Sequence, residues 1–208
     1  MLTTQAILQE LITLWVVIDP IGTLPVIPAV TARMTPEQRR STAFRAIAIS
    51  FAVLLLFILV GQIVLEALGL SLASFQIAGG LVLLLFALSM IFGDSKPETE
   101  MASVDTTQTA IFPLAMPSIA SPGAMLAVVV LTDNDRNSIA HQAMTTGIMA
   151  VVMLAALGIL LAANPIYRVI GNGGASIISR IMGMILAAVA VDAMLNGMVA
   201  VGALAPFE

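Results

Sequence analysis

Six long apolar segments, separated by short polar joints, follow one another along the chain. They lie near residues 7–30, 44–67, 73–93, 109–131, 141–162 and 177–201. A helix that crosses the hydrocarbon core of a bilayer needs roughly 20 apolar residues, and each segment is long enough. The alternation typical of a barrel strand is missing, and open strands leave backbone groups unsatisfied in lipid. The pattern predicts an all-α, polytopic membrane protein with six transmembrane helices in one integral membrane domain, residues 1–208.

The composition supports a bilayer environment and excludes several function classes. The chain is 60% hydrophobic and only 10% charged, and its mean hydropathy is +1.08. A soluble domain carries about 25% charged residues. The net charge of −4 provides no basic patch for nucleic acid. Cysteine is absent, which excludes disulfides, thiol redox chemistry and cysteine-based metal sites.

The basic residues predict the orientation of the six segments. If both termini lie outside, the first, third and fifth joints and the adjacent helix ends are cytoplasmic. These regions hold seven of the eight basic residues: Arg33, Arg39, Arg40, Arg45, Lys96, Arg168 and Arg180. The positive-inside rule therefore favours both termini outside, in the plasma membrane of a prokaryote. No basic residue precedes Arg33, so we expect the first span to lack a signal peptide's n-region and to stay in the mature protein.

An internal repeat indicates that the six spans form two halves. Residues 75–93 align with residues 179–197, and the motif DPIG at 19–22 aligns with SPGA at 121–124. Each half contains three spans, and an odd number forces the second half to run upside down. The sequence thus predicts two inverted three-helix repeats, approximately residues 6–93 and 109–201, joined by a polar linker at 94–108.

Helix-start signals lie inside the first and fourth apolar segments, where a membrane helix would be expected to continue. Asp19-Pro20 and Ser121-Pro122 each pair a favoured N-cap with a proline suited to the first helical position. We therefore expect spans one and four to be broken or kinked at mid-membrane. Pro25 and Pro117 would disrupt the helical hydrogen bonds further, and Gly22 and Gly123 would permit a close approach of the backbone.

Two such breaks would build a polar site in the membrane. A helix N-terminus presents unpaired N–H groups and about half a positive charge, so two of them could converge on one carboxylate. An ionised Asp at a helix centre costs about 2.5–3.5 kcal/mol, whereas a cap hydrogen bond returns about 1 kcal/mol. Asp19 would then need a further partner: a substrate ammonium, a cation or a proton. The alternative is that Asp19 only caps its own half-helix and the prolines only kink.

Three stretches around these residues resemble a known family. The segments IDPIGTLPV, FQIAGGLVLLLFA and FPLAMPSIASPGAM are similar to those of the MarC family, also described as small neutral amino acid transporters. That family looks related to the lysine-exporter superfamily of six-span membrane proteins. The resemblance implies a multi-pass plasma-membrane protein of bacterial or archaeal type. Some members are credited with uptake or exchange of glycine and alanine, and others carry a multiple-antibiotic-resistance label.

The resemblance also implies which residues form the site. The matching positions are Asp19, Pro20, Gly22, Pro25, Gly79, Gly80, Pro113, Pro117, Pro122 and Gly123. This chain departs from the family pattern in the fourth span, where Ser118 and Ser121 replace an apolar residue and a glycine. Two hydroxyl groups would enlarge the hydrogen-bonding capacity of the site and put its amino acid specificity in question.

Asp192 is the second acidic residue inside a predicted span. It could be an ion- or proton-coupling site beside Asp19, or it could make a structural contact with Asn196 one turn later. Small residues at Gly79, Gly80 and Gly183 favour close helix packing.

A few polar residues lie near the ends of the predicted spans. A lone His141 cannot form a His-cluster metal site, and we expect an interfacial structural role for it. Glu10 and Glu66 are expected to reach the outer interface.

The leading hypothesis is a secondary transporter for a small zwitterion. The half-helix N-termini would take its carboxylate, and Asp19 with hydroxyls from Thr23, Ser118 or Ser121 would meet its ammonium. No nucleotide-binding motif is present, so exchange or an Na⁺ or H⁺ gradient would drive transport without a cofactor or bound metal. The alternatives are a channel, a non-transport membrane protein and, less favoured, an aspartyl enzyme using Asp19 and Asp192. The sequence leaves a monomer and a homo-oligomer equally open.

Overall fold

The computed structural model describes residues 4–24, 26–93, 110–134 and 137–206, and all regular structure within these ranges is helical. Its elements in chain order are α1 (Thr4–Ile18), α2 (Val26–Thr31), α3 (Pro36–Ala67), α4 (Leu72–Phe92), the π-helical segment η2 (Ala110–Ile119), α6 (Pro122–Leu131) and α7 (Ile139–Ala200). Pro25 and the expected linker at 94–108 lie outside the described residues.

The lengths and surfaces of these helices suit a membrane. α3, α4 and α7 are long and apolar enough to cross a bilayer, and α1 and α6 are shorter apolar helices. Large apolar side chains lie exposed along the outer faces of the long helices, among them Leu59, Leu85 and Leu154. Exposing such side chains to water is unfavourable, whereas lipid tails solvate them.

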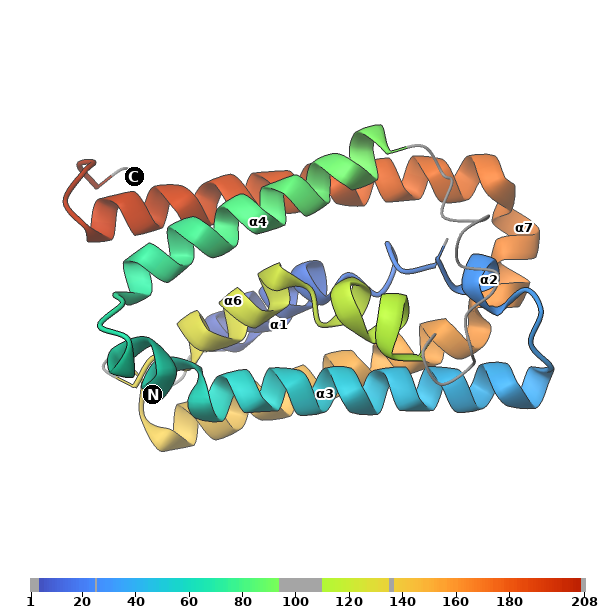
Figure 1. The fold of residues 1–208 in the computed structure, drawn as a ribbon, viewed down its shortest axis with the longest axis horizontal. Helices are drawn as coiled ribbons and strands as arrows, with labels where there is room; N and C mark the ends of the chain where they lie inside the picture. Colours follow the sequence, from blue (N-terminus) through green and yellow to red (C-terminus); the bar gives the residue numbers. More distant parts are fainter. Residues whose placement is uncertain (1–3, 25, 94–109, 135–136, 207–208) are drawn as a thin grey trace.

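α7 is one helix of 62 residues that folds into two limbs. The bend is at Gly171, whose φ of 66° is a left-handed conformation that glycine adopts without steric cost. Figure 1 shows the C-terminal limb running back beside α4. The polar stretch from Asn164 to Ser176, expected as a joint between two spans, is therefore helical except at Gly171, where the backbone leaves helical geometry.

The interior consists of two groups of buried side chains. The larger joins α1, α3, η2, α6 and the N-terminal limb of α7, with Leu14, Leu54 and Met149 among its fully buried members. The smaller group, Leu83, Ala87, Leu186 and Ala190, fills the contact between α4 and the C-terminal limb of α7. The short helices thus pack in the middle of the molecule, with long helices outside them (Figure 1).

Polar caps define where the long helices begin. Thr35 and Gln38 form a capping box at the start of α3, and Pro36 occupies its first turn. Ser71 caps α4 and Ser138 caps α7 in the same way, each accepting a backbone N–H with its hydroxyl. These side chains satisfy N–H groups that a helix leaves unpaired.

α1 begins, α3 ends and α7 ends at the same end of the molecule (Figure 1).

Candidate functional site: two helix breaks and two cavities

The first break follows α1 and is centred on Asp19. This residue is only 3% exposed, and its φ of 49° lies in the left-handed region. Its carboxylate Oδ1 accepts the Gly22 N–H at 2.9 Å. Its carbonyl accepts both the N–H and the hydroxyl of Thr23, at 3.2 and 3.0 Å. Asp19 therefore organises a turn, and the next helix, α2, begins at Val26 and not at Pro20 as the sequence suggested.

A close approach of backbone and side chain explains the glycine in this turn. A Cβ atom added to Gly22 would lie 1.9 Å from the Asp19 carboxylate oxygen Oδ2. Any larger residue would displace the carboxylate from the Gly22 N–H. The motif Asp-Pro-x-Gly is thus explained by the hydrogen bond between its first and last residues.

The second break separates η2 from α6. η2 is a π-helical segment that contains Pro113 and Pro117, two residues without an N–H for the helical hydrogen-bond ladder. The Ser121 hydroxyl accepts the Ala124 N–H at 3.0 Å, and Pro122 occupies the first turn of α6. The predicted helix start at Ser121-Pro122 is confirmed.

One hydroxyl joins the two breaks. Ser121 Oγ donates to the carbonyl of Val17 at 2.8 Å, and Ser121 is 1% exposed. Val17 lies in the last turn of α1, where carbonyls have no partner within the helix. The positive N-terminus of α6 thus meets the negative C-terminus of α1, an arrangement that the helix dipoles favour. Residues 104 positions apart are held together in the protein interior.

Three other residues that the sequence predicted for the site lie in or next to the two breaks. Ser118 is half-buried in η2, and Thr23 and Gly123 are buried beside the breaks. The side chains of Pro113 and Pro117, like Pro25, are outside the described part of the chain.

Asp192 is not part of the buried junction. It lies exposed on the C-terminal limb of α7, where its Oδ2 accepts the Asn196 side-chain N–H at 3.0 Å. The Asp19 carboxylate is buried and accepts the Gly22 N–H, so the two carboxyl groups have separate partners.

The glycines of the third and sixth apolar segments lie at helix contacts. A Cβ atom on Gly79 would meet Leu126 of α6 at 3.1 Å. Cβ atoms on Gly80 and Gly183 would lie 2.8 and 2.9 Å from the backbone oxygens of Ala190 and Ala87. The backbones of α4 and α7 approach closely at these positions.

A buried polar cluster links α1 to α7, and the sequence did not indicate it. His141 Nε2 lies 2.8 Å from Glu10 Oε1, and the Thr145 hydroxyl donates to Glu10 Oε2 at 2.8 Å. Glu10 is 6% exposed, so the expectation that it reaches the interface is wrong. Its two partners lie more than 130 positions away, and only tertiary packing brings them together. Glu66, by contrast, is exposed.

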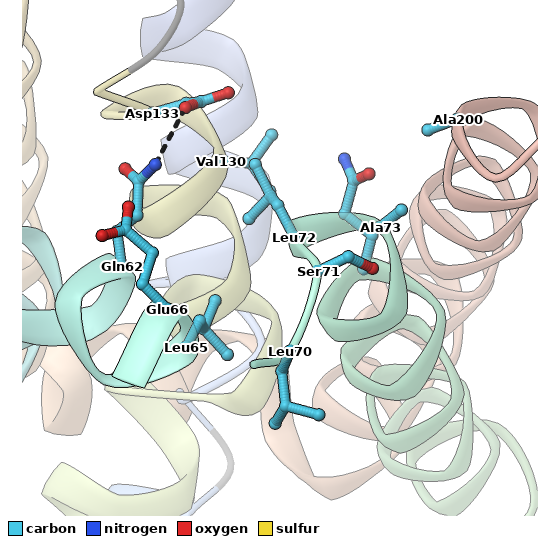
Figure 2. Close-up of a pocket in the computed structure, with 11 residues that line it drawn as sticks. Gln62, Leu65, Glu66, Leu70, Ser71, Leu72, Ala73, Val130, Asp133 and Ala200 are labelled. Carbon is cyan, nitrogen blue, oxygen red and sulfur yellow. Dashed lines mark hydrogen bonds between the residues drawn. The ribbon is translucent and has the colours of Figure 1, made fainter. Parts of the chain in front are cut away.

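Two cavities lie near opposite ends of α3. The first, of about 520 Å³, is shown in Figure 2; its polar lining comes from Gln62, Glu66, Ser71, Gln76 and Asp133. The second, of about 470 Å³, has Thr31, Arg39, Arg40 and Asn164 as its polar lining. One cavity is acidic and the other basic. Neither is lined by Asp19 or Ser121, so neither reaches the junction between the breaks.

No group of three or more metal-binding side chains occurs among the described residues. The junction itself presents hydrogen-bonding groups and one carboxylate, that of Asp19. Buried carbonyls, N–H groups and hydroxyls at two interrupted helices can bind a small polar molecule when they are released from one another.

Comparisons with known proteins agree with this picture. The profile of the MarC family of integral membrane proteins matches residues 4–201. A UPF0056 membrane protein of Archaeoglobus fulgidus is 33% identical over 190 residues, covering 89% of each chain. The UPF0056 inner membrane protein YhgN of Escherichia coli K12 is 29% identical over 195 residues, covering 92% of this chain and 95% of its own. No solved structure matches.

Proposed function

Because the chain belongs to the MarC family of integral membrane proteins, we propose that it is a secondary transporter of small neutral amino acids or a similar small zwitterion. The observation that carries the proposal is the buried junction in which Ser121 joins the second helix break to the end of α1. Interrupted helices that meet inside a membrane bundle are typical of transporter binding sites. A purely structural membrane protein would not need them.

The helix arrangement supports six spans in two inverted repeats. α1 with α2, α3 and α4 would be the first three; η2 with α6 and the two limbs of α7 would be the second three. A hydroxyl of α3, Ser50, donates to Ala115 of η2 at 3.3 Å, and a hydroxyl of α7, Thr145, donates to Glu10 of α1 at 2.8 Å. Each repeat thus contributes a broken span that contacts the second span of the other repeat, as a pseudo-twofold axis requires.

The junction offers complementary groups to a zwitterion. The substrate carboxylate would bind at the positive N-terminus of α6, near Gly123. The Asp19 carboxylate would form an ion pair with the ammonium group. The hydroxyls of Thr23, Ser118 and Ser121 would complete the site. Asp19 and Ser121 are bonded to the chain's own groups in this conformation, so substrate binding would exchange these hydrogen bonds for bonds to the ligand.

The burial of the two candidate acids indicates which of them would couple transport to H⁺ or Na⁺. Asp19 is buried beside the breaks, whereas Asp192 is exposed on α7. A group that couples an ion to the substrate must lie near the substrate, so we favour Asp19. Transport would follow from rocking one repeat against the other, which opens the junction to each side in turn.

The test is counterflow of radiolabelled glycine, alanine and serine in proteoliposomes, with wild type beside Asp19→Asn. Asparagine tolerates a left-handed φ and keeps an oxygen that can accept the Gly22 N–H, so the turn should survive while the charge is lost. We expect saturable exchange by wild type and at least a roughly tenfold loss in the variant, as for loss of one charged hydrogen bond.

Two results would overturn the assignment. Equal exchange by both proteins would remove Asp19 from the site. Absence of exchange by folded wild type would exclude these amino acids as substrates. Single-channel currents across a planar bilayer would favour the channel alternative. Asn196→Ala, which removes a polar group on exposed α7, serves as a control that should leave exchange unchanged.

A further inference from the structure

The ends of the two inner half-helices are tied to opposite ends of α3. We propose that Arg39 and Gln62 of α3 are two latches, each of which closes one side of the protein by holding the helix that follows a break. This inference rests on the proposed carrier function. Arg39 and Gln62 would control on which side of the membrane the carrier is open.

Arg39 holds α2. Its Nε donates to the Thr31 carbonyl at 3.1 Å, and its Nη2 donates to the Ala32 carbonyl at 3.4 Å. Thr31 is the last residue of α2, and its carbonyl also accepts the Met34 N–H at 3.0 Å, so Arg39 binds the carbonyls of the turn that ends this helix. A cation at a helix C-terminus also interacts favourably with the helix dipole. Arg39 therefore fixes the end of α2 against the first turn of α3.

Gln62 holds the end of α6 (Figure 2). Its Nε2 donates to Asp133 Oδ1 at 3.2 Å, and its Oε1 accepts the Asn134 N–H at 2.8 Å. These two residues follow Thr132, the C-cap of α6. One amide side chain thus makes two hydrogen bonds, in opposite directions, to the segment that ends the second half-helix.

The two latches both lie on α3, but the segments that they hold occupy equivalent places in the two repeats. Thr31 and Asp133 lie 102 positions apart, the same spacing as Asp19 and Ser121. Arg39 and Thr31 line the basic cavity, and Gln62 and Asp133 line the acidic one. Each cavity therefore has a latch in its wall.

The distance between the latches suits the two faces of a membrane. α3 is helical from Pro36 to Ala67 without interruption. From position 39 to position 62 such a helix rises about 35 Å, close to the roughly 30 Å of a bilayer core. A half-helix released at one end of α3 would open its cavity toward the junction on that side only. With both latches bonded, the junction is separated from both cavities.

The absence of cysteine permits a direct test. Ala120→Cys places a thiol between η2 and α6 at a fully buried position. Its reaction with a membrane-impermeant maleimide is followed in right-side-out and inside-out vesicles, alone and combined with Arg39→Ala or Gln62→Ala. We expect Gln62→Ala to speed labelling from the side of the α3 C-terminus and Arg39→Ala from the opposite side. Each effect should be roughly five- to tenfold, as for loss of one hydrogen bond.

Each latch has a matched control in the same region. Arg40 lines the same cavity as Arg39 but lies over the Phe44 ring. Gln142 of α7 donates to Asn134 Oδ1 at 2.8 Å without tying this segment to α3. Arg40→Ala and Gln142→Ala should therefore leave both labelling rates unchanged.

The proposal is overturned if both latch variants speed labelling from one side, if neither does, or if the controls match them. Gln62→Glu provides a second variant with nearly unchanged volume. Its carboxylate cannot donate to Asp133 and repels it, so labelling should rise from the same side as in Gln62→Ala. Thiol labelling needs no substrate, so failure of amino acid exchange and failure of the latches are separate results.

Discussion

Asp19 combines burial, a left-handed backbone, a carboxylate that accepts the Gly22 N–H and a backbone carbonyl that accepts the Thr23 hydroxyl. A non-glycine residue in this conformation costs about 1–3 kcal/mol and persists only where the surroundings impose it. Here the hydrogen bonds to Gly22 and Thr23 hold it in place. Such strain clusters at sites where a conformation is exchanged for another, which agrees with a break that opens and closes.

Gly22→Ala tests the contact within this turn. The added Cβ would lie 1.9 Å from Asp19 Oδ2 and would displace the carboxylate, so we expect a loss of about 1–3 kcal/mol in the free energy of unfolding. In a protein that already carries Asp19→Ala, the carboxylate that the new Cβ would clash with is gone. Gly22→Ala should then lower the free energy of unfolding much less. Thermal unfolding of the four proteins of this double-mutant cycle measures the difference.

The matched control is Gly158→Ala in α7, where no atom lies within 4 Å of an added Cβ. Alanine has the higher helix propensity, so stability should stay equal or rise by up to about 1 kcal/mol. Equal costs of Gly22→Ala with and without the Asp19 carboxylate would show that the glycine serves another purpose.

At the scale of elements, α4 and the C-terminal limb of α7 pack through small residues. Ala73, Gly80 and Ala87 of α4 meet Gly197, Ala190 and Gly183 of α7, and the spacing is seven residues on each helix. A seven-residue repeat keeps one face of each helix turned toward its antiparallel partner. Small side chains let the backbones approach, which is how membrane helices associate without a hydrophobic driving force.

Gly183→Val should separate these two helices. Its Cβ would lie 2.9 Å from the Ala87 backbone oxygen, which cannot move aside like a side chain. Overpacking of this kind costs about 1–3 kcal/mol, and we expect a lower midpoint of thermal unfolding in detergent. Ala188→Val on the exposed face of the same limb should leave the midpoint nearly unchanged. Equal effects of the two substitutions would argue that α4 and α7 do not depend on this close approach.

At the scale of the whole molecule, charge is distributed between the two ends. The beginning of α3 and the bend of α7 lie at one end, and the chain termini lie at the other (Figure 1). The first end carries Arg39, Arg40 and Arg45 in the first turns of α3. The positive-inside rule then predicts that this end faces the cytoplasm and that both termini face outward.

Two single-cysteine variants test this orientation. Ser41→Cys and Leu68→Cys place exposed thiols at the two ends of α3. In intact cells an impermeant maleimide should label position 68 and not position 41, and in inside-out vesicles the preference should reverse. Labelling of both positions from the same side would exclude α3 as a membrane span, and a reversed preference would invert the topology.

The features that sequence predicted are those set by neighbouring residues. Long apolar segments indicate membrane helices because lipid solvates only apolar side chains and internally bonded backbone. Ser121-Pro122 indicates a helix start because a hydroxyl cap and a proline both act within one turn. The interruptions after Ile18 and Ile119 were predictable for the same reason.

Tertiary structure decided the rest, because the partners are far apart in sequence. The bonds from Ser121 to Val17, from Thr145 to Glu10 and from Gln62 to Asp133 join residues 71 to 135 positions apart. No local pattern distinguishes a glutamate that will be buried against a histidine from one that reaches the interface. The sequence by itself determined that the chain enters a membrane and where its helices are interrupted. Packing determined which groups meet at those interruptions.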